Sequence, residues 1–298
     1  VYVGVGGQSI RSVKNVITKD LPANTKVTED MVVDLMEANR AMEYPDQEKQ
    51  SYVIQEYKVD SQYQIDPVGI QCSHLEGNFL NILQRYTFYK NLNRCLENAG
   101  INVADMFISP IALADSILTE TEKRSGCALV DIGADTTTVC VYNKNILRHL
   151  AVIPLGSRNI TKDIASLQIE ESEAEKMKLK YASAYTDNAD IDNNLKLPID
   201  QERSVDSRKF IEIVEGRLEE IIENVWNQIP SDYYEKLLLG GIILTGGGSN
   251  MKNIEKAFYN YTHLDKIRVA KFVNYTVKST NPDINAKNGM MNTILGLL

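Results

Sequence analysis

Two short apolar stretches, each ending in a turn of small residues, constrain the fold of this chain most. They are ALVDIGADTTTV (Ala128 to Val139) and GIILTGGGSN (Gly241 to Asn250). The apolar run in each predicts a buried strand, and glycines or hydroxylated residues follow it directly. A turn of this kind presents several backbone N–H groups on a concave surface, which suits phosphate oxygens. The two stretches therefore predict an α/β protein with a phosphate site at two strand ends.

The first turn leaves two interpretations open. Asp131, at the end of its strand, can hold a hydrated Mg²⁺, because magnesium usually keeps several waters and needs only one or two carboxylates. The alternative is a tight hairpin in which Gly133 only supplies an unusual φ angle. The motif alone does not decide between them.

The second turn favours a ligand. Gly246, Gly247 and Gly248 stand between the predicted strand and a predicted helix from Asn250 to Tyr261. Glycines let a ligand approach the backbone and can direct a helix N-terminus at it. A plain strand-to-helix connection is the alternative, but it does not need the entropic cost of three glycines. Neither turn has Walker or Rossmann spacing.

Composition excludes several classes of protein. With 298 residues, 43% of them hydrophobic, the chain can form about two domains at roughly 150 residues each. A net charge of -8 without a clustered basic surface argues against nucleic acid as a partner. No stretch is apolar enough to predict a membrane-spanning helix. The four cysteines lack metal-ligand spacing and are expected to be reduced core thiols; a metal or redox site is the less favoured alternative.

The segment before the first turn predicts a small α+β unit followed by alternating strands and helices. Thr28 to Met42 has a Thr cap and helical spacing, and Ser51 to Asp66 alternates with period two, which predicts one strand. This unit contains no plausible catalytic constellation. The helical character after Ser157 predicts a second subdomain, which the helix Ser207 to Ile229 closes.

Both turns, in this order and with a helical insertion between them, resemble the phosphate and adenosine motifs of the actin and sugar-kinase superfamily. Within it, three blocks look most like the bacterial cell-division family FtsA: Ala128 to Ala165, Ile242 to Ala257, and ESEAEKMKLKYASA (Glu171 to Ala184). The resemblance implies an α/β, actin-like, two-lobed fold with an extra small α+β (SHS2-like) subdomain.

The resemblance also implies a division of the chain. Lobe 1 contains the SHS2-like subdomain and a remainder, and lobe 2 contains a nucleotide core and a helical partner-binding subdomain. A C-terminal helix returns to lobe 1. The expected boundaries, in that order, are 1–77, 78–120, 121–156 with 239–284, 157–238, and 285–298. The N-terminal phosphate hairpin of the superfamily is absent, as is the amphipathic helix that the family has at its C-terminus, so the chain is expected to be truncated at both ends.

ATP and Mg²⁺ are the implied cofactors, with Asp131 as the metal residue. The residues that the resemblance assigns to nucleotide are Asp131, Gly133, Ala134, Asp135, Thr136, Glu175, Lys178, Thr245, Gly246, Gly247, Gly248 and Ser249. Glu175 and Lys178 would face ribose and base, or would be solvated helix charges. Asp135 departs from the family pattern Asp-Ile-Gly-Gly-Gly-Thr-Thr-Asp and puts a carboxylate near the phosphates, which is unfavourable unless it turns outward or meets the metal.

Catalysis has little support in the sequence. Active relatives orient water with a glutamine or glutamate at the start of the connecting helix, and the matching position is Ser109. The expectation is a nucleotide binder with weak or no ATPase activity and no catalytic residue. Arg217 and Glu220 resemble the helix on which the family docks the acidic FtsZ tail; intrahelical ion pairs are the equally weighted alternative.

The implied function is an ATP-binding scaffold that polymerises and tethers FtsZ filaments to the cytoplasmic membrane. Other divisome proteins would bind residues 1–77. The inner membrane would be reached through a C-terminal amphipathic helix not present in this chain, at the cytoplasmic face of the division site. The alternatives are another actin-like scaffold, such as a pilus-assembly protein, and a phosphotransferase of the same superfamily.

Overall fold

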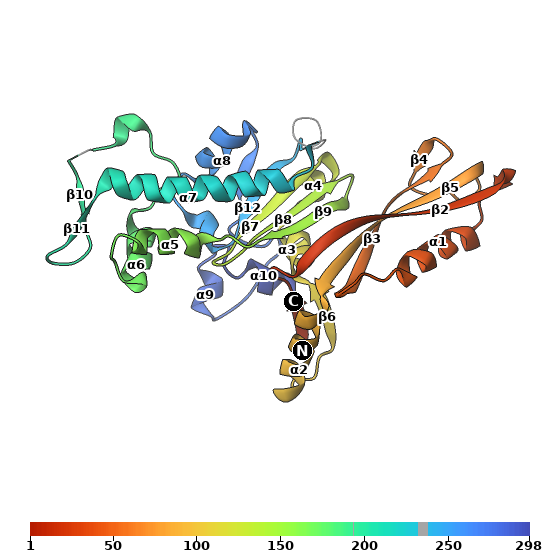
Figure 1. Cartoon of the computed structure of the whole chain (residues 1–298), viewed down its shortest axis with the longest axis horizontal. Helices are drawn as coiled ribbons and strands as arrows, with labels where there is room; N and C mark the ends of the chain where they lie inside the picture. The colour runs from red at the N-terminus through yellow and green to blue at the C-terminus, as the bar shows by residue number, and fades with distance from the viewer. Residues whose placement is uncertain (193, 232–237) are drawn as a thin grey trace.

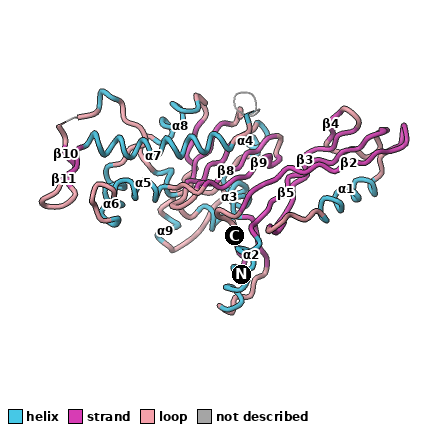
Figure 2. Tube along the Cα trace, viewed as in Figure 1, coloured by secondary structure: helices cyan, strands magenta, loops and turns pink. Residues whose placement is uncertain are grey.

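The structure is a computed structural model that describes residues 1–192, 194–231 and 238–298. The molecule is elongated, with a central sheet between a β-rich unit at one end and a group of helices at the other (Figure 1). Strands dominate the first of these ends and helices the second (Figure 2).

The central sheet has five strands in the order β13-β12-β7-β8-β9. They are β7 (Cys127–Ile132), β8 (Thr137–Asn143), β9 (Ile146–Ile153), β12 (Gly241–Thr245) and β13 (Ile267–Val269). The strands β7, β8 and β9 form an antiparallel meander, whereas β12 lies parallel to β7 and pairs Thr245 with Asp131. This register places the two predicted turns side by side at one edge of the sheet.

Each face of the sheet belongs to a separate core, since alternate side chains of a strand point to opposite faces. In β12, Ile242 and Leu244 pack in one core and Ile243 in the other. The first core includes residues from α5 (Ser157–Ala165), α6 (Glu171–Tyr181), α7 (Ser207–Gln228) and α8 (Ile254–Thr262). The second includes residues from α3 (Ser109–Ile117) and α10 (Asn292–Gly296). Burial on both faces explains the unbroken apolar runs of the strands.

Shorter elements complete the second half of the chain. They are α4 (Glu120–Ser125), η1 (Asn188–Asp190), β10 (Lys196–Pro198), β11 (Ser204–Asp206), η3 (Gly247–Asn250) and α9 (Pro282–Asn285). The strands β10 and β11 form a small antiparallel hairpin that leads directly into α7.

The β-rich unit is a four-stranded antiparallel sheet in the order β2-β5-β3-β4, with α1 (Glu29–Ala41) packed on one face. Its strands are β2 (Ile10–Lys26), β3 (Gln47–Val59), β4 (Gln62–Gln64) and β5 (Gln71–Arg85). The prediction of one strand from Ser51 to Asp66 was wrong, because the chain turns at Asp60, which has a φ of 51°. Asp60 holds this turn by accepting hydrogen bonds from the backbone N–H groups of Ser73 and His74.

Hydrogen bonds join the β-rich unit to the free edge of the central sheet. The Oγ of Ser12 donates to the Leu150 carbonyl at 3.0 Å and accepts from the Leu150 N–H at 2.8 Å. Nε2 of Gln55 donates to the Leu147 carbonyl at 2.9 Å. These bonds satisfy backbone groups of β9 that an edge strand would otherwise leave unpaired.

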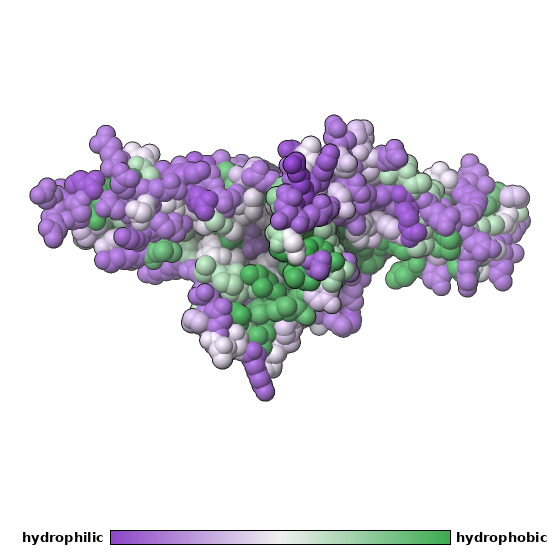
Figure 3. All heavy atoms as spheres, turned by 90° about the horizontal axis from the view of Figure 1, so that it is seen from below, coloured by the Kyte–Doolittle hydropathy of each residue, from purple (hydrophilic) through white to green (hydrophobic). Residues whose placement is uncertain are grey.

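A short parallel pair, β1 (Tyr2–Val5) with β6 (Asp105–Ile108), and helix α2 (Tyr86–Asn98) lie beside the chain ends (Figure 1). Apolar side chains gather near the middle of the face shown in Figure 3. The β1–β6 pair itself exposes Tyr2 and Phe107, whose rings lie 5.6 Å apart. Cys95 on α2 is exposed, so the expectation that all four cysteines are core thiols was wrong; the other three are buried. In the described part of the chain, no helix is long and apolar enough to cross a membrane.

Candidate functional site

The second turn packs against the end of β7, directly before the first turn, so closely that two of its glycines leave no room for a side chain. An ideal Cβ on Gly246 would lie 2.3 Å from Oδ1 of Asp131, and one on Gly248 would lie 2.4 Å from Cγ2 of Ile132. Gly246 also has a φ of +84°, which other residues rarely adopt. Gly247 is exposed, and its Cβ would meet nothing closer than Met290 at 3.6 Å. Two of the three glycines therefore serve the packing of the turns, and the third borders open space.

The second turn does not lead directly into a helix. Residues Gly247–Asn250 form a single 3₁₀ turn, and α8 begins only at Ile254, after Asn253 with a φ of 62°. The prediction of a helix starting at Asn250, with its N-terminus directed by the glycines, was therefore wrong. The left-handed conformation of Asn253 redirects the chain before the helix starts.

The first turn is held by the start of helix α5. Within it, the Gly133 N–H donates to the Thr136 carbonyl at 2.9 Å. The N–H of Ser157 then donates to the Gly133 carbonyl at 2.9 Å, and that of Arg158 to the Ala134 carbonyl at 2.8 Å. The first turn and α5 therefore form one hydrogen-bonded unit.

Asp135 turns outward from this unit. Its carboxylate accepts hydrogen bonds from Nη1 of Arg158 at 2.8 and 3.0 Å, and both side chains are about half exposed. Asp131 lies at the junction of the two turns instead, where burial raises the pKa of its carboxyl to about 6. Of these two carboxylates, the one that lies near both turns, Asp131, is therefore the less solvated.

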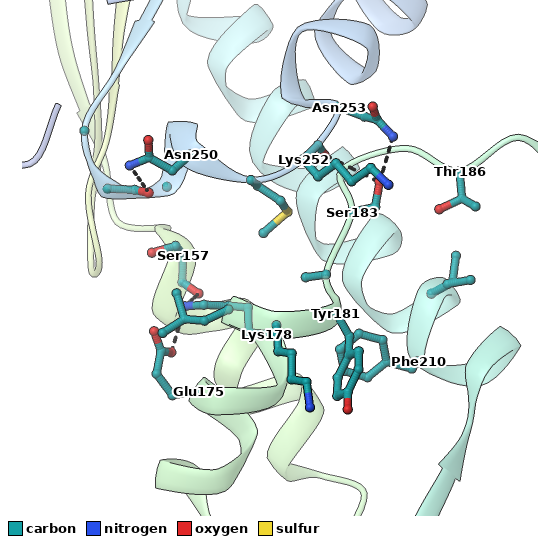
Figure 4. Close-up of a pocket in the computed structure, with 18 of the residues that line it drawn as sticks. Ser157, Glu175, Lys178, Tyr181, Ser183, Thr186, Phe210, Asn250, Lys252 and Asn253 are labelled. Carbon is teal, nitrogen blue, oxygen red and sulfur yellow. Dashed lines mark hydrogen bonds and ion pairs between the residues drawn. The ribbon is translucent and has the colours of Figure 1, made fainter. Parts of the chain in front are cut away.

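A cavity of about 1050 Å³ opens in front of the two turns. This volume is close to the upper end of the roughly 300–1,000 Å³ typical of small-molecule sites. Eight of the sequence-predicted residues line it: Asp131, Gly133, Ala134, Glu175, Lys178, Gly246, Gly247 and Gly248. The glycine turns form one end of its wall, and the other end includes the aromatic side chains of Tyr181 and Phe210 (Figure 4).

Four of the residues that were assigned to nucleotide are not part of the cavity wall: Asp135, Thr136, Thr245 and Ser249. Two of them hold the second turn from behind. The buried Oγ1 of Thr245 donates to the Ala270 carbonyl at 3.0 Å, and the buried Oγ of Ser249 donates to the Gly246 carbonyl at 2.7 Å.

Glu175 and Lys178 lie next to each other on α6 and are tied to α5. Nζ of the buried Lys178 donates to the Ser157 carbonyl at 3.1 Å and to Oγ1 of Thr161 at 2.9 Å, and lies 2.8 Å from Oε2 of Glu175. Oγ1 of Thr161 donates to the same carboxylate. Burial alone would raise the pKa of Glu175, but the hydrogen bonds from Lys178 and Thr161 outweigh it, so this pKa lies below its ordinary value. The interpretation of Glu175 and Lys178 as simply solvated helix charges was therefore wrong for Lys178.

Comparison with known proteins places this architecture in a family. A sequence model of the cell division protein FtsA matches residues 128–296, and a model of the SHS2 domain inserted in FtsA matches residues 7–83. The chain belongs to the FtsA family. It is 30% identical over its whole length to the cell division protein FtsA of Pseudomonas aeruginosa, of which the match covers 71%. For the FtsA of Porphyromonas gingivalis the identity is 31% over 85% of this chain and 54% of the relative, so the chain spans about half of that protein.

Solved structures show the fold of this FtsA-family chain to be actin-like. MreB5 of Spiroplasma citri bound to AMPPNP superposes with a TM-score of 0.53 at 17% identity, over 70% of this chain and 62% of that protein. The PilM–PilN type IV pilus biogenesis complex gives a TM-score of 0.56 at 15% identity, over 96% of this chain and 75% of the matched one. The predicted actin-like fold with an SHS2 subdomain is confirmed.

Arg217, which the FtsA resemblance singled out for docking, already has acidic partners. Its Nε lies 2.5 Å and its Nη2 3.2 Å from the two carboxylate oxygens of Asp163 on α5, and its Nη1 donates to Glu220. The intrahelical pair with Glu220 was one of the two interpretations of this motif. The pair with Asp163 was not foreseen, because it joins two helices.

Sequence reasoning missed several residues of the cavity wall. Ser183 and Asn253 come from segments far apart in the chain, and Nδ2 of Asn253 donates to Oγ of Ser183 at 3.1 Å (Figure 4). Helix α6 ends at Tyr181, and this leaves Ser183 free to pair with Lys252. Neither Tyr181 nor Phe210 carries a sequence signal of its own, since both have the helical spacing of ordinary core residues.

In the described part of the chain, no group of three or more His, Cys, Asp or Glu residues could hold a metal ion. The sequence assigned a single residue, Asp131, to a metal, and this residue lies at the junction of the two turns. A hydrated magnesium ion requires no more than this, because water can supply most of its ligands.

Proposed function

We propose that this FtsA-family chain binds ATP with Mg²⁺ in the cavity and acts in cell division as a polymerising scaffold that tethers FtsZ filaments to the cytoplasmic membrane. The observation that carries the proposal is the pairing of Thr245 with Asp131, which brings both glycine turns to the mouth of one cavity. Backbone N–H groups in such turns favour phosphate oxygens.

The cavity suggests how the nucleotide lies. The phosphates would occupy the end formed by Gly133, Ala134 and Gly247, with a hydrated Mg²⁺ at Asp131. The base would lie toward Tyr181 and Phe210, whose rings provide apolar surface at the other end. MreB5, which has the same fold, was solved bound to AMPPNP, and this supports a nucleotide ligand for the present chain.

Nucleotide would act mainly as a conformational or polymerisation ligand. Ser109, the first residue of α3, is not among the residues that line the cavity, and serine lacks the acid or amide with which active relatives orient water. Slow or absent hydrolysis follows from this. A steady-state phosphate-release assay on the full-length protein tests the proposal, because fast substrate-dependent turnover would favour the phosphotransferase alternative.

The acidic FtsZ C-terminal tail would dock on α7 at Arg217 and Glu220. A guanidinium forms bidentate pairs with carboxylates, and Arg217 remains 25% exposed in its present pairing. Other divisome proteins would bind the β-rich unit, and copies of the chain would associate into filaments. The protein would lie at the cytoplasmic face of the inner membrane, at the division site.

Capture by an immobilised FtsZ tail peptide tests the docking directly. Wild type should be captured and the Arg217→Glu variant should not, since the substitution reverses the charge that meets the tail. Equal capture of both forms would show that the tail does not dock at Arg217. No capture of either would favour a different actin-like scaffold, for example of the pilus-assembly type.

A further inference from the structure

The guanidinium of Arg217 is already bound by carboxylates of its own chain. Asp163 takes two of its nitrogens, Nε and Nη2, and Glu220 takes the third, Nη1. Hydrogen bonding to Asp163 raises the pKa of Arg217 above its ordinary value, so the arginine stays charged. One positive charge therefore faces two negative charges, and the cluster carries a net charge of about -1.

The two carboxylates hold the arginine differently. Asp163 belongs to α5 and is the bidentate partner, with a side chain 32% exposed. Glu220 lies three residues from Arg217 on the same helix and contacts it through one oxygen, with a side chain 46% exposed. The bidentate pair is the stronger of the two, because two parallel N–H···O bonds share one rigid fork.

An acidic peptide that binds Arg217 would make the same bidentate contact as Asp163. The fork of a guanidinium accommodates one carboxylate at a time along its Nε–Nη2 edge. That edge is occupied, and the net negative cluster opposes the approach of further negative charge. A carboxylate that takes the Nε–Nη2 edge must therefore displace Asp163.

We propose that Asp163 is an internal competitor that sets the affinity of Arg217 for an acidic peptide. This inference rests on the proposed docking at Arg217. Asp163 lies on the helix whose first two N–H groups bind the first glycine turn. The residue that competes with the peptide is thus part of a helix anchored at the mouth of the cavity.

The test is a fluorescence anisotropy titration of an FtsZ tail peptide against the full-length protein. Asp163→Asn removes the competing charge and keeps the side-chain volume. It should bind the peptide about three- to fivefold more tightly than wild type, which is the upper part of the range for a partly exposed ion pair.

The matched control is Glu212→Gln on α7, the helix that carries Arg217. Glu212 pairs with Arg208 at 3.1 Å, so the substitution changes the net charge equally without touching Arg217. Its affinity should stay within about twofold of wild type, since it reports only the general charge of α7. If both variants gained affinity equally, the effect would be one of net charge, and Asp163 would not be a competitor.

Two further outcomes separate the competition from the docking itself. If Asp163→Asn binds no more tightly than wild type while Arg217→Glu binds poorly, Asp163 is not a competitor and the docking stands. If Arg217→Glu binds as well as wild type, or if no form binds the peptide, both the docking and the competition are overturned. Thermal unfolding of each variant must show that α5 remains folded.

Discussion

The two glycine turns of this FtsA-family chain differ in how they are held. The first, at Gly133 to Thr136, is fixed by backbone hydrogen bonds from the start of α5, and its Ala134 and Asp135 are exposed. The second, at Gly246 to Gly248, is fixed by packing against the end of β7.

This difference explains where the sequence departs from its family pattern. Backbone bonds tolerate any side chain that points to solvent, so the first turn can carry Ala134 and Asp135 in positions where the family has glycines. The close packing of the second turn excludes a Cβ at two of its three glycines. Substitutions should therefore be costly at Gly246 and Gly248 and inexpensive in the exposed part of the first turn.

The largest effect is expected from Gly246→Ala. The new Cβ would lie 2.3 Å from Asp131 and the backbone has a φ of +84°. Strain and overpacking together should lower the free energy of unfolding by about 2–4 kcal/mol. Urea denaturation measures this, with Gly247→Ala as the control expected to cost at most about 1 kcal/mol. Similar losses in the two variants would show that the packing of the turns is unimportant.

Lys178→Met tests the support of the first turn. It removes the bonds to Ser157 and Thr161 and leaves Glu175 without its cation. The expected loss of stability is about 1–3 kcal/mol, the cost of leaving buried polar groups unpaired. Lys176→Met, an exposed position on the same helix, should change stability by less than about 0.5 kcal/mol. Were both variants equally stable, α6 would not support the turn.

Asp131→Asn should stabilise the protein without ligand at neutral pH. In the folded chain this carboxyl has a pKa of about 6, above its unfolded value, so its ionisation opposes folding. Its contribution to stability falls as pH rises from about 4 to about 6 and is constant above that. The stability of the variant should not decrease over this pH range. At pH 7 its free energy of unfolding should exceed that of wild type by about 1–3 kcal/mol. Chemical denaturation across this pH range provides the measurement, and parallel profiles would contradict the burial of a charged Asp131.

The smallest effect is expected from Asp135→Ala. Its exposed ion pair with Arg158 should contribute less than about 1 kcal/mol to stability. Because Asp135 does not line the cavity and its carboxylate pairs with Arg158, the affinity for ATP should stay within about twofold of wild type. A gain of tenfold or more in isothermal titration would mean that Asp135 does face the phosphates.

Features that depend on local pattern could be predicted from the sequence. The buried strands and the glycine turns follow from apolar runs that end in small residues, and Thr28 does cap α1 by accepting from the Met31 N–H. The adjacency of the turns came from the family resemblance, since no local pattern specifies which strands pair.

What could not be predicted depends on contacts between distant segments. Asp163 meets Arg217 across two helices, and Asn253 meets Ser183 between two loops. Cys95 looked like a core residue, yet α2 has no buried residue in this structure. The helix predicted from Asn250 to Tyr261 does form, but it starts only at Ile254, after the left-handed Asn253.

The most direct test of a nucleotide site between the two turns is a titration of ATP in the presence of Mg²⁺ with wild type and Gly247→Val. Gly247 borders the cavity and, unlike Gly246 and Gly248, has space for a side chain. We expect wild type to bind, and Gly247→Val to retain its thermal stability but bind at least about tenfold more weakly, because the side chain occupies the approach of the phosphates. Equal affinities of the two forms, or no binding by wild type, would contradict a nucleotide site at this position.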